Sequence, residues 1–246
     1  MADGVPLPHE SFYFLTLIVM RKLFLAVAVV ATLALATSCG GGQSGQNVES
    51  EMYQINFSAE SPNPKQGKSV LVISASPRRG GNTDLLCDEF ARGAAEAGAK
   101  VEKVFLDDYK IDLFREIDTY MQPDSVAKAQ ARDDAYIVIN KMLRSDVIVL
   151  ASPVYYLNIN GQMKNLIDRT FYCFMQLKDK EFYYITASAD VESYAADCAV
   201  EGFRGFVRCL PNPTERGMVR ALGMGRKGGV EGSPYMQQAY ELGKGV

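Results

Sequence analysis

From residue 69 onward, short apolar runs alternate with longer segments in which apolar residues recur at helical spacing. The runs predict buried strands, and the segments between them predict helices. The predicted strands are Ser69–Ser74, Val101–Leu106, Asp146–Ala151, Phe182–Ala187 and Met218–Leu222. The predicted helices are Thr83–Ala97, Asp133–Arg144, Gly161–Phe171, Val191–Leu210 and a last one that begins after an N-cap at Ser233. This alternation is typical of a three-layer α/β fold with a parallel sheet.

The number of strand–helix units and the length of this region favour a flavodoxin-like fold, with a five-stranded parallel sheet of order 2-1-3-4-5. In such sheets ligands bind outside the carboxyl ends of the strands, at the point where the strand order reverses. That point lies between the first and the third strand. We therefore expect the binding loops to be those after Ser74 and after Ala151.

The loop after the first predicted strand reads Ser74-Ala-Ser-Pro-Arg-Arg-Gly-Gly-Asn-Thr83 and leads directly into a helix. A phosphate there would meet free backbone N–H groups and the positive end of the helix dipole, and Arg78 or Arg79 could add charge-assisted hydrogen bonds. An ordinary turn with a capping residue is the alternative, but capping alone does not call for Ser-Pro-Arg-Arg beside it. The candidate phosphate ligands are Ser76, Arg78, Gly81, Asn82 and Thr83.

The loop after the third predicted strand, Ser152–Gly161, is rich in flat apolar side chains. Such side chains, together with backbone donors, suit a planar ring, whereas packing at a sheet edge is the alternative. The candidate ring contacts are Pro153, Val154, Tyr155 and Tyr156. The loop after the fourth strand, Ala187–Asp190, adds Ser188 as a further candidate at the same edge.

Three of these segments resemble a known family. The string SPRRGGNTDLL (residues 76–86) resembles the phosphate loop of the NAD(P)H-dependent FMN reductases, which have the flavodoxin fold. Ser152-Pro-Val-Tyr155 resembles that family's loop for the isoalloxazine ring, and VEGSPYMQQAYELGKGV (residues 230–246) resembles its closing segment. The resemblance spans residues 69–246. The string at residues 76–86 lacks the Gly-Lys-Ser/Thr of an ATP-binding P-loop, so ATP is not indicated as a ligand.

The resemblance implies FMN as cofactor, NADH or NADPH as electron donor, and a small-molecule acceptor such as a quinone, a free flavin, or a nitro or azo compound. It also implies a homodimer. Some members of this family carry a cysteine cluster after the second strand, but residues 107–132 contain no cysteine, so an iron-sulfur centre is not expected. The alternative function is a flavodoxin-type electron carrier, which would bind the same FMN and serve a protein partner at the membrane.

The N-terminal region resembles the signal peptide of a bacterial lipoprotein. The basic pair Arg21-Lys22 precedes an apolar run, Leu23–Ala36, that is short for a membrane span and ends in small residues before Cys39. We therefore predict a leader and signal peptide over residues 1–38, a flexible tether over 39–68 and an FMN-binding domain over 69–246. The protein would be attached to the membrane of the bacterial cell envelope by lipid at Cys39. A plain transmembrane anchor is the alternative, and translation could start at Met1 or Met20.

Charge and histidine content exclude several function classes. A formal net charge of −3 argues against a dedicated nucleic-acid binder, which would carry a basic surplus. The single histidine is His9, so histidine-based catalytic triads and histidine-ligated metal sites are disfavoured. The chemistry is therefore expected to depend on a bound cofactor.

Two further patterns are assigned no function. The other cysteines, Cys87, Cys173, Cys198 and Cys209, form no metal-binding spacing and suit buried thiols, although pairing of Cys198 with Cys209 stays open. The string Gly223–Gly228 fits G-x-G-x-x-G but opens no helix, and the chain ends before an acidic partner could follow. We interpret it as a flexible surface turn.

Overall fold

The computed structural model describes residues 67–114 and 133–246. They form a five-stranded, all-parallel sheet of order β2-β1-β3-β4-β5, as predicted. The strands are β1 Ser69–Ser74, β2 Lys100–Phe105, β3 Val147–Pro153, β4 Glu181–Ala187 and β5 Thr214–Ala221. Because β1 and β3 lie inside the sheet and are covered on both faces, their residues are apolar almost throughout.

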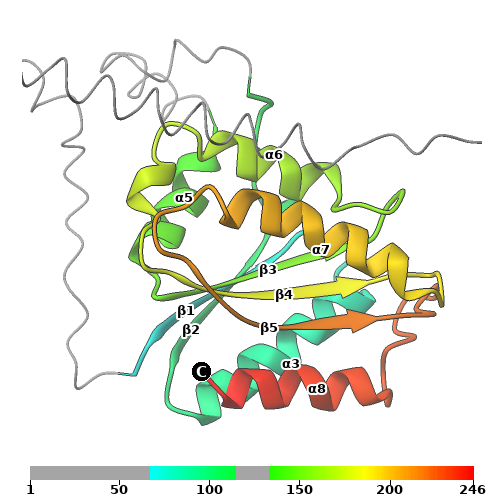
Figure 1. Ribbon diagram of the computed structural model, residues 1–246. Helices are drawn as coiled ribbons and strands as arrows, with labels where there is room; N and C mark the ends of the chain where they lie inside the picture. Colours follow the sequence, from blue (N-terminus) through cyan, green and yellow to red (C-terminus); the bar gives the residue numbers. More distant parts are fainter. Residues whose placement is uncertain (1–66, 115–132) are drawn as a thin grey trace, which may run out of the picture. The chain divides into compact units, whose positions relative to one another are not determined.

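Helices cover both faces of the sheet (Figure 1), with α5, α6 and α7 on one face and α3 and α8 on the other. Their bounds are α3 Asn82–Glu96, α5 Ala135–Arg144, α6 Gly161–Arg169, α7 Ser193–Val207 and α8 Pro234–Lys244. Two short 3-10 helices, Leu106–Asp108 and Phe174–Gln176, complete the described elements. In the part of the chain that the structure describes, no helix combines the length and the apolar character that crossing a bilayer requires.

The element boundaries differ from the prediction by up to four residues, most of all in β5 and α7. Strand β5 begins at Thr214 rather than Met218, because its polar first half pairs with β4 on one side only and stays exposed on the other. Helix α7 is shorter at both ends than Val191–Leu210. Strand β3 continues through Ser152 and Pro153, since Pro153 still pairs with Ala187 of β4. The predicted ring loop therefore begins only at Val154.

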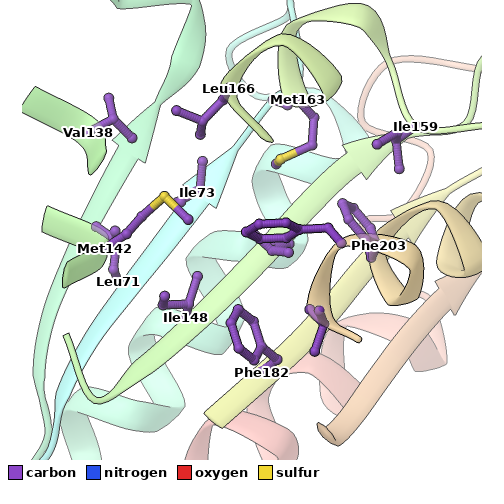
Figure 2. Close-up of a cluster of buried hydrophobic side chains, with 14 of the residues drawn as sticks. Leu71, Ile73, Val138, Met142, Ile148, Ile159, Met163, Leu166, Phe182 and Phe203 are labelled. Atoms are coloured by element: carbon purple, nitrogen blue, oxygen red, sulfur yellow. The ribbon is translucent and has the colours of Figure 1, made fainter. Parts of the chain in front are cut away.

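Two apolar cores result, one on each face of the sheet. On the side of α5, α6 and α7, Ile73 and Ile148 from the sheet pack among helix side chains such as Met142, Met163 and Phe203 (Figure 2). On the side of α3 and α8, alternate residues of the same strands pack against Phe90 and its neighbours. The sheet is thus buried on both faces, and polar side chains gather at its ends.

A buried ion pair joins α6 to the segment before α5. Arg169, the last residue of α6, is only 1% exposed, and its guanidinium bonds both carboxylate oxygens of Asp133 and the carbonyl of Asp112. Burial opposes ionisation of Asp133, but the Arg169 guanidinium and the N–H groups of Ala135 and Asp112 outweigh it and lower the Asp133 pKa. The bonds from Arg169 therefore attach Asp112 and Asp133 to α6. These two residues lie before and after positions 115–132 in the chain.

The predicted leader, tether and lipid-bearing Cys39 lie outside the described residues, apart from the last two tether positions. The predicted division into residues 1–38, 39–68 and 69–246 therefore stays a prediction.

Helices α3 and α8 approach so closely that only glycine fits at their contact. A Cβ atom at Gly93 would collide with the Tyr240 carbonyl oxygen, and one at Gly243 would collide with the Phe90 carbonyl oxygen. These are backbone atoms that cannot rotate away. The contact therefore depends on the absence of a side chain at both positions.

We expect Gly243→Ala to lower the free energy of unfolding by about 2 kcal/mol or more, because the helices must separate to admit the methyl group. Gly205→Ala is the matched control, since Gly205 lies in α7 and a methyl group there would meet nothing within 4 Å. It should raise the free energy of unfolding by about 0.5–1 kcal/mol through helix propensity. Urea denaturation of both variants measures this, and equal effects would contradict the packing argument.

Candidate functional site

The carboxyl ends of β1, β3, β4 and β5 bring four loops to one edge of the sheet. Strand β1 ends at Ser74 opposite Ala151, whereas β3, β4 and β5 continue further and end side by side. Hydrogen bonds from Ala75 N to Ala151 O, from Val154 N to Ala187 O and from Ser188 N to Ala221 O extend the ladder into the loops. The loops predicted from sequence to bind a ligand therefore emerge next to one another.

The loop between β1 and α3 is a tight turn built on glycine. Gly80 has a φ of +65°, and a Cβ at Gly81 would lie 2.8 Å from the Arg78 carbonyl oxygen. The Ser76 hydroxyl donates to that carbonyl at 3.0 Å and accepts from the Arg78 N–H at 3.2 Å. Ser76 therefore shapes the turn, and its hydroxyl is used within it rather than directed outward as predicted.

The turn leads to polar groups that a phosphate could use. The first N–H groups of α3 have no partners within the helix. Among the described residues, neither the Thr83 hydroxyl nor the Arg78 guanidinium has a hydrogen bond or an ion pair, although Thr83 is only 2% exposed. A glycine turn, a helix N-terminus, an unbonded hydroxyl and an unpaired guanidinium together suit an anion.

The structure distinguishes the two arginines of the loop. Arg79 forms an ion pair with Asp108 and stacks on the Phe105 ring at 4.3 Å, and the hydrogen bond to Asp108 raises the pKa of Arg79. Arg78 is therefore the arginine available to a ligand. The nearby Asp84 would repel an anion, but its carboxylate is held by Lys103 at 2.7 Å and by the Gly80 N–H at 2.9 Å.

Asn82 lies in the loop as predicted, but its side chain serves a different purpose. Its amide nitrogen donates to the carbonyls of Met224 and Arg226 at 2.8 and 2.7 Å, and its oxygen accepts from the Val230 N–H at 3.1 Å. Both amide hydrogens are therefore used inside the protein, whereas the sequence predicted that this side chain would donate to a phosphate. Only its backbone N–H remains for a ligand.

The predicted ring loop contains a strained two-residue turn. Tyr155 and Asn158 exchange backbone hydrogen bonds of 2.9 and 3.1 Å, and the residues between them, Tyr156 and Leu157, have φ of +50° and +61°. This geometry favours Asn-Gly, so a Tyr-Leu pair costs conformational energy. Tyr156 nevertheless projects fully into solvent. Strain that presents an exposed aromatic ring points to a function.

Two backbone N–H groups of this loop already form hydrogen bonds within the protein. The Val154 N–H bonds Ala187, and the Tyr155 N–H bonds Asn158. Pro153 and Val154 are half-buried against the sheet, whereas Tyr155 is exposed. The loop therefore offers mainly an apolar surface, as the sequence predicted.

Asn160, which the sequence pattern did not single out, joins the two binding loops. It is 4% exposed and is the N-cap of α6, accepting from the Met163 N–H at 3.1 Å. Its amide nitrogen donates to the Ala75 carbonyl in the first loop, and its backbone N–H donates to the Ser152 hydroxyl at 2.9 Å. Its place before a predicted helix was the available signal, since asparagine is a preferred N-cap.

The loops after β4 and β5 are also joined. The Ser188 hydroxyl, predicted to border a ligand, is buried and accepts from the Asp190 N–H at 3.1 Å, while the Ser188 carbonyl accepts from the Met224 N–H at 2.6 Å. The Gly223–Gly228 string is thus held by Ser188 on one side and by Asn82 on the other. The string is a largely exposed turn, as predicted, and hydrogen bonds join it to the loops after β1 and β4.

Known proteins are similar to the part of the chain that runs from β1 into α7. A model of the family described as NADPH-dependent FMN reductase matches residues 69–199, from β1 into α7. An iron-sulfur flavoprotein of Archaeoglobus fulgidus is 36% identical over 101 residues, covering 41% of this chain and 48% of that protein. An iron-sulfur flavoprotein of Methanocaldococcus jannaschii is 37% identical over 101 residues, covering 41% and 51%. The match spans about half the length of these relatives.

Solved structures share the fold at low identity. An azoreductase from Bacillus anthracis has a TM-score of 0.56 and 18% identity, covering 73% of this chain and 100% of that chain. An FMN-dependent NADH-azoreductase from B. anthracis in complex with FMN has a TM-score of 0.55 and 14% identity, covering 72% and 96%. These likenesses identify the flavodoxin-like architecture.

The cysteines of the described residues do not suit an iron-sulfur cluster. Cys87 and Cys173 are buried in the two cores on opposite faces of the sheet, and burial raises the pKa of both thiols, that of Cys173 to about 12. Cys198 and Cys209 are free and exposed, and the helical rise of about 1.5 Å per residue from Cys198 to the end of α7 keeps them too far apart for a disulfide. No group of metal-binding side chains gathers within the described ranges.

We expect Tyr156→Gly to raise the free energy of unfolding by about 0.5–1 kcal/mol, since relief of the left-handed strain exceeds the entropy cost of glycine. Tyr194→Gly is the matched control, because Tyr194 is also exposed but lies in the helical backbone of α7. It should lower the free energy of unfolding by about 1 kcal/mol. If Tyr156→Gly destabilises the protein as much as Tyr194→Gly does, the turn is not strained.

Proposed function

This chain belongs to the NADPH-dependent FMN reductase family, and we propose that it oxidises NADH or NADPH and reduces a small apolar acceptor such as a quinone or a flavin. FMN is the cofactor of this family and a reduced nicotinamide is its electron donor. The observation that carries the proposal is the glycine turn before α3, with an unpaired Arg78 and the unbonded hydroxyl of Thr83, a residue that is largely buried.

The residues of this loop fit the phosphate of FMN. The Arg78 guanidinium would supply charge-assisted hydrogen bonds, and the N–H groups of Asn82 and Thr83 would donate at the helix N-terminus. The Ser76 hydroxyl and the two glycines would keep the turn in the shape that exposes these donors. Lys103 would neutralise Asp84, which otherwise opposes a dianion.

The apolar loop after β3 fits a planar ring. Pro153 and Val154 would contact one surface of the ring, and Asn160 would hold this loop at a constant distance from the phosphate loop by its bonds to Ala75 and Ser152. When bound, FMN supplies the redox centre that takes electrons from the nicotinamide and delivers them to the acceptor. The chain needs no histidine for this, and the described residues contain none.

The exposed side chains beside this loop favour an apolar, planar acceptor. Tyr155, Tyr156 and Leu157 are all exposed on the strained turn. Aromatic rings stack readily on flat apolar molecules, whereas no cluster of cations lies on the turn itself to attract an anionic one. A quinone therefore suits the site better than a charged acceptor.

We expect the purified full chain to be yellow, to release FMN on denaturation, and to oxidise NADH or NADPH steadily when a quinone is supplied. Absorbance at the flavin and nicotinamide bands measures both properties. A protein that retains FMN but oxidises neither nicotinamide would instead be an electron carrier of the flavodoxin type. A colourless protein that takes up no added FMN would overturn both functions.

We expect Arg78→Ala to weaken FMN binding about tenfold, because it removes a charge-assisted hydrogen bond to the phosphate. Arg79→Ala removes the same charge from the next position, where the guanidinium is committed to Asp108, and should change FMN affinity less than about twofold. Titration of the apoprotein by flavin fluorescence gives both values. Equal losses for the two variants would mean that only the total charge of the loop matters.

We also propose that the protein is attached to the membrane of the cell envelope by lipid at Cys39, and that it forms a homodimer, as the resemblance to the family implies. The small residues before Cys39 and the apolar run after Arg21-Lys22 support the lipid site. Labelled fatty acid should be incorporated into the protein in bacterial cells and should be lost in Cys39→Ser. Incorporation that persists in Cys39→Ser would refute this attachment site.

A further inference from the structure

The loop between β5 and α8, residues 222–233, lies directly against the phosphate loop. The Asn82 side chain bonds Met224, Arg226 and Val230 along this loop. At its start the loop is held from the other side, because the N–H groups of Gly223 and Met224 donate to the carbonyls of Asp190 and Ser188. The path of residues 223–230 is therefore determined by groups on both sides.

This path brings Lys227 over the glycine turn. A Cβ atom at Gly80 would lie 3.7 Å from Cε of Lys227. The ammonium nitrogen is bonded to Cε, so the positive charge lies within a few ångströms of the turn that Arg78 and the start of α3 also border. A Cβ atom at this distance would be in ordinary van der Waals contact with the lysine stem, so it is the φ of +65° that favours glycine at position 80.

Lys227 is not held in its position by an ion pair with an acidic side chain. Within residues 67–114 and 133–246, neither Lys227 nor Arg78 forms an ion pair. The nearest acid of the turn, Asp84, is held by Lys103 and by the Gly80 N–H. Two cations thus lie beside the positive end of the α3 dipole, which is unfavourable unless an anion joins them.

We propose that Lys227 is a second cation of the phosphate site and that Asn82 is the positioning residue that holds it there. The inference rests on the proposed function, because the anion is the phosphate monoester of FMN. A phosphate monoester carries a charge of about −1.5 to −2 at neutral pH. Arg78 alone balances only part of that charge, and Lys227 balances the rest. The pair therefore selects FMN over riboflavin, which lacks the phosphate.

The test is titration of the full-chain apoprotein with FMN and with riboflavin, followed by flavin fluorescence. We expect Lys227→Gln to weaken FMN binding about fivefold to tenfold, to leave riboflavin binding unchanged, and to reduce the salt dependence of FMN binding. Lys227→Arg should restore most of the affinity. Lys178→Gln, an exposed lysine without an ion pair in the loop before β4, removes the same charge far along the chain and should change neither affinity.

The role of Asn82 is tested by a double-mutant cycle. Asn82→Ala should weaken FMN binding by about the same factor as Lys227→Gln, and the double variant should be no weaker than either single one, because both changes remove the same cation. Effects that multiply would show that Asn82 does not act through Lys227. Circular dichroism of each variant confirms that it is folded.

Three outcomes distinguish the role of Lys227 from the function of the whole site. If the wild-type protein binds no FMN, the proposed function fails and the role of Lys227 fails with it. If the wild-type protein binds FMN and Lys227→Gln binds it equally well, or loses riboflavin affinity in parallel, the proposed function stands and Lys227 is not a phosphate ligand.

Discussion

Parallel pairing of strands that are buried on both faces is the constraint on which the rest of this structure depends. Helices cover both faces of the sheet, so the inner strands accept almost no polar side chain. Because all strands run in one direction, their carboxyl ends meet at one edge. Polar residues, glycine turns and strained backbone are therefore collected where the chain leaves β1, β3, β4 and β5, which is also where a cofactor can reach them.

Two buried or half-buried asparagines hold these loops together. Asn160 joins the loop after β3 to the loop after β1, and Asn82 joins the loop after β1 to the loop after β5. An amide side chain suits this task because it both donates and accepts, and so it can bond several backbone groups of neighbouring loops. Rigid loops favour tight binding, since little conformational entropy is lost when a ligand enters.

The strained turn at Tyr156 and Leu157 is the exception to this pattern. Glycine or asparagine would form the same turn at lower cost, yet the chain has two bulky residues there, one of them fully exposed. Their apolar surface is of no use to the folded monomer, because it is not buried. Under the proposed function, this apolar surface would contact the planar acceptor.

Hydrophobic periodicity and loop composition are local properties of the chain, so they were enough to predict the strands, their order and the two candidate binding loops. They also singled out Arg78 and the Tyr155–Tyr156 pair, whose side chains are exposed. The folded arrangement was needed to show that Arg79 pairs with Asp108, that the Asn82 side chain bonds the β5–α8 loop, and that Lys227 reaches the glycine turn. These contacts could not be predicted, because they join residues up to 148 positions apart in the chain. A local sequence pattern shows whether a side chain can donate or accept a hydrogen bond. It does not show which distant residue the fold brings within hydrogen-bonding distance.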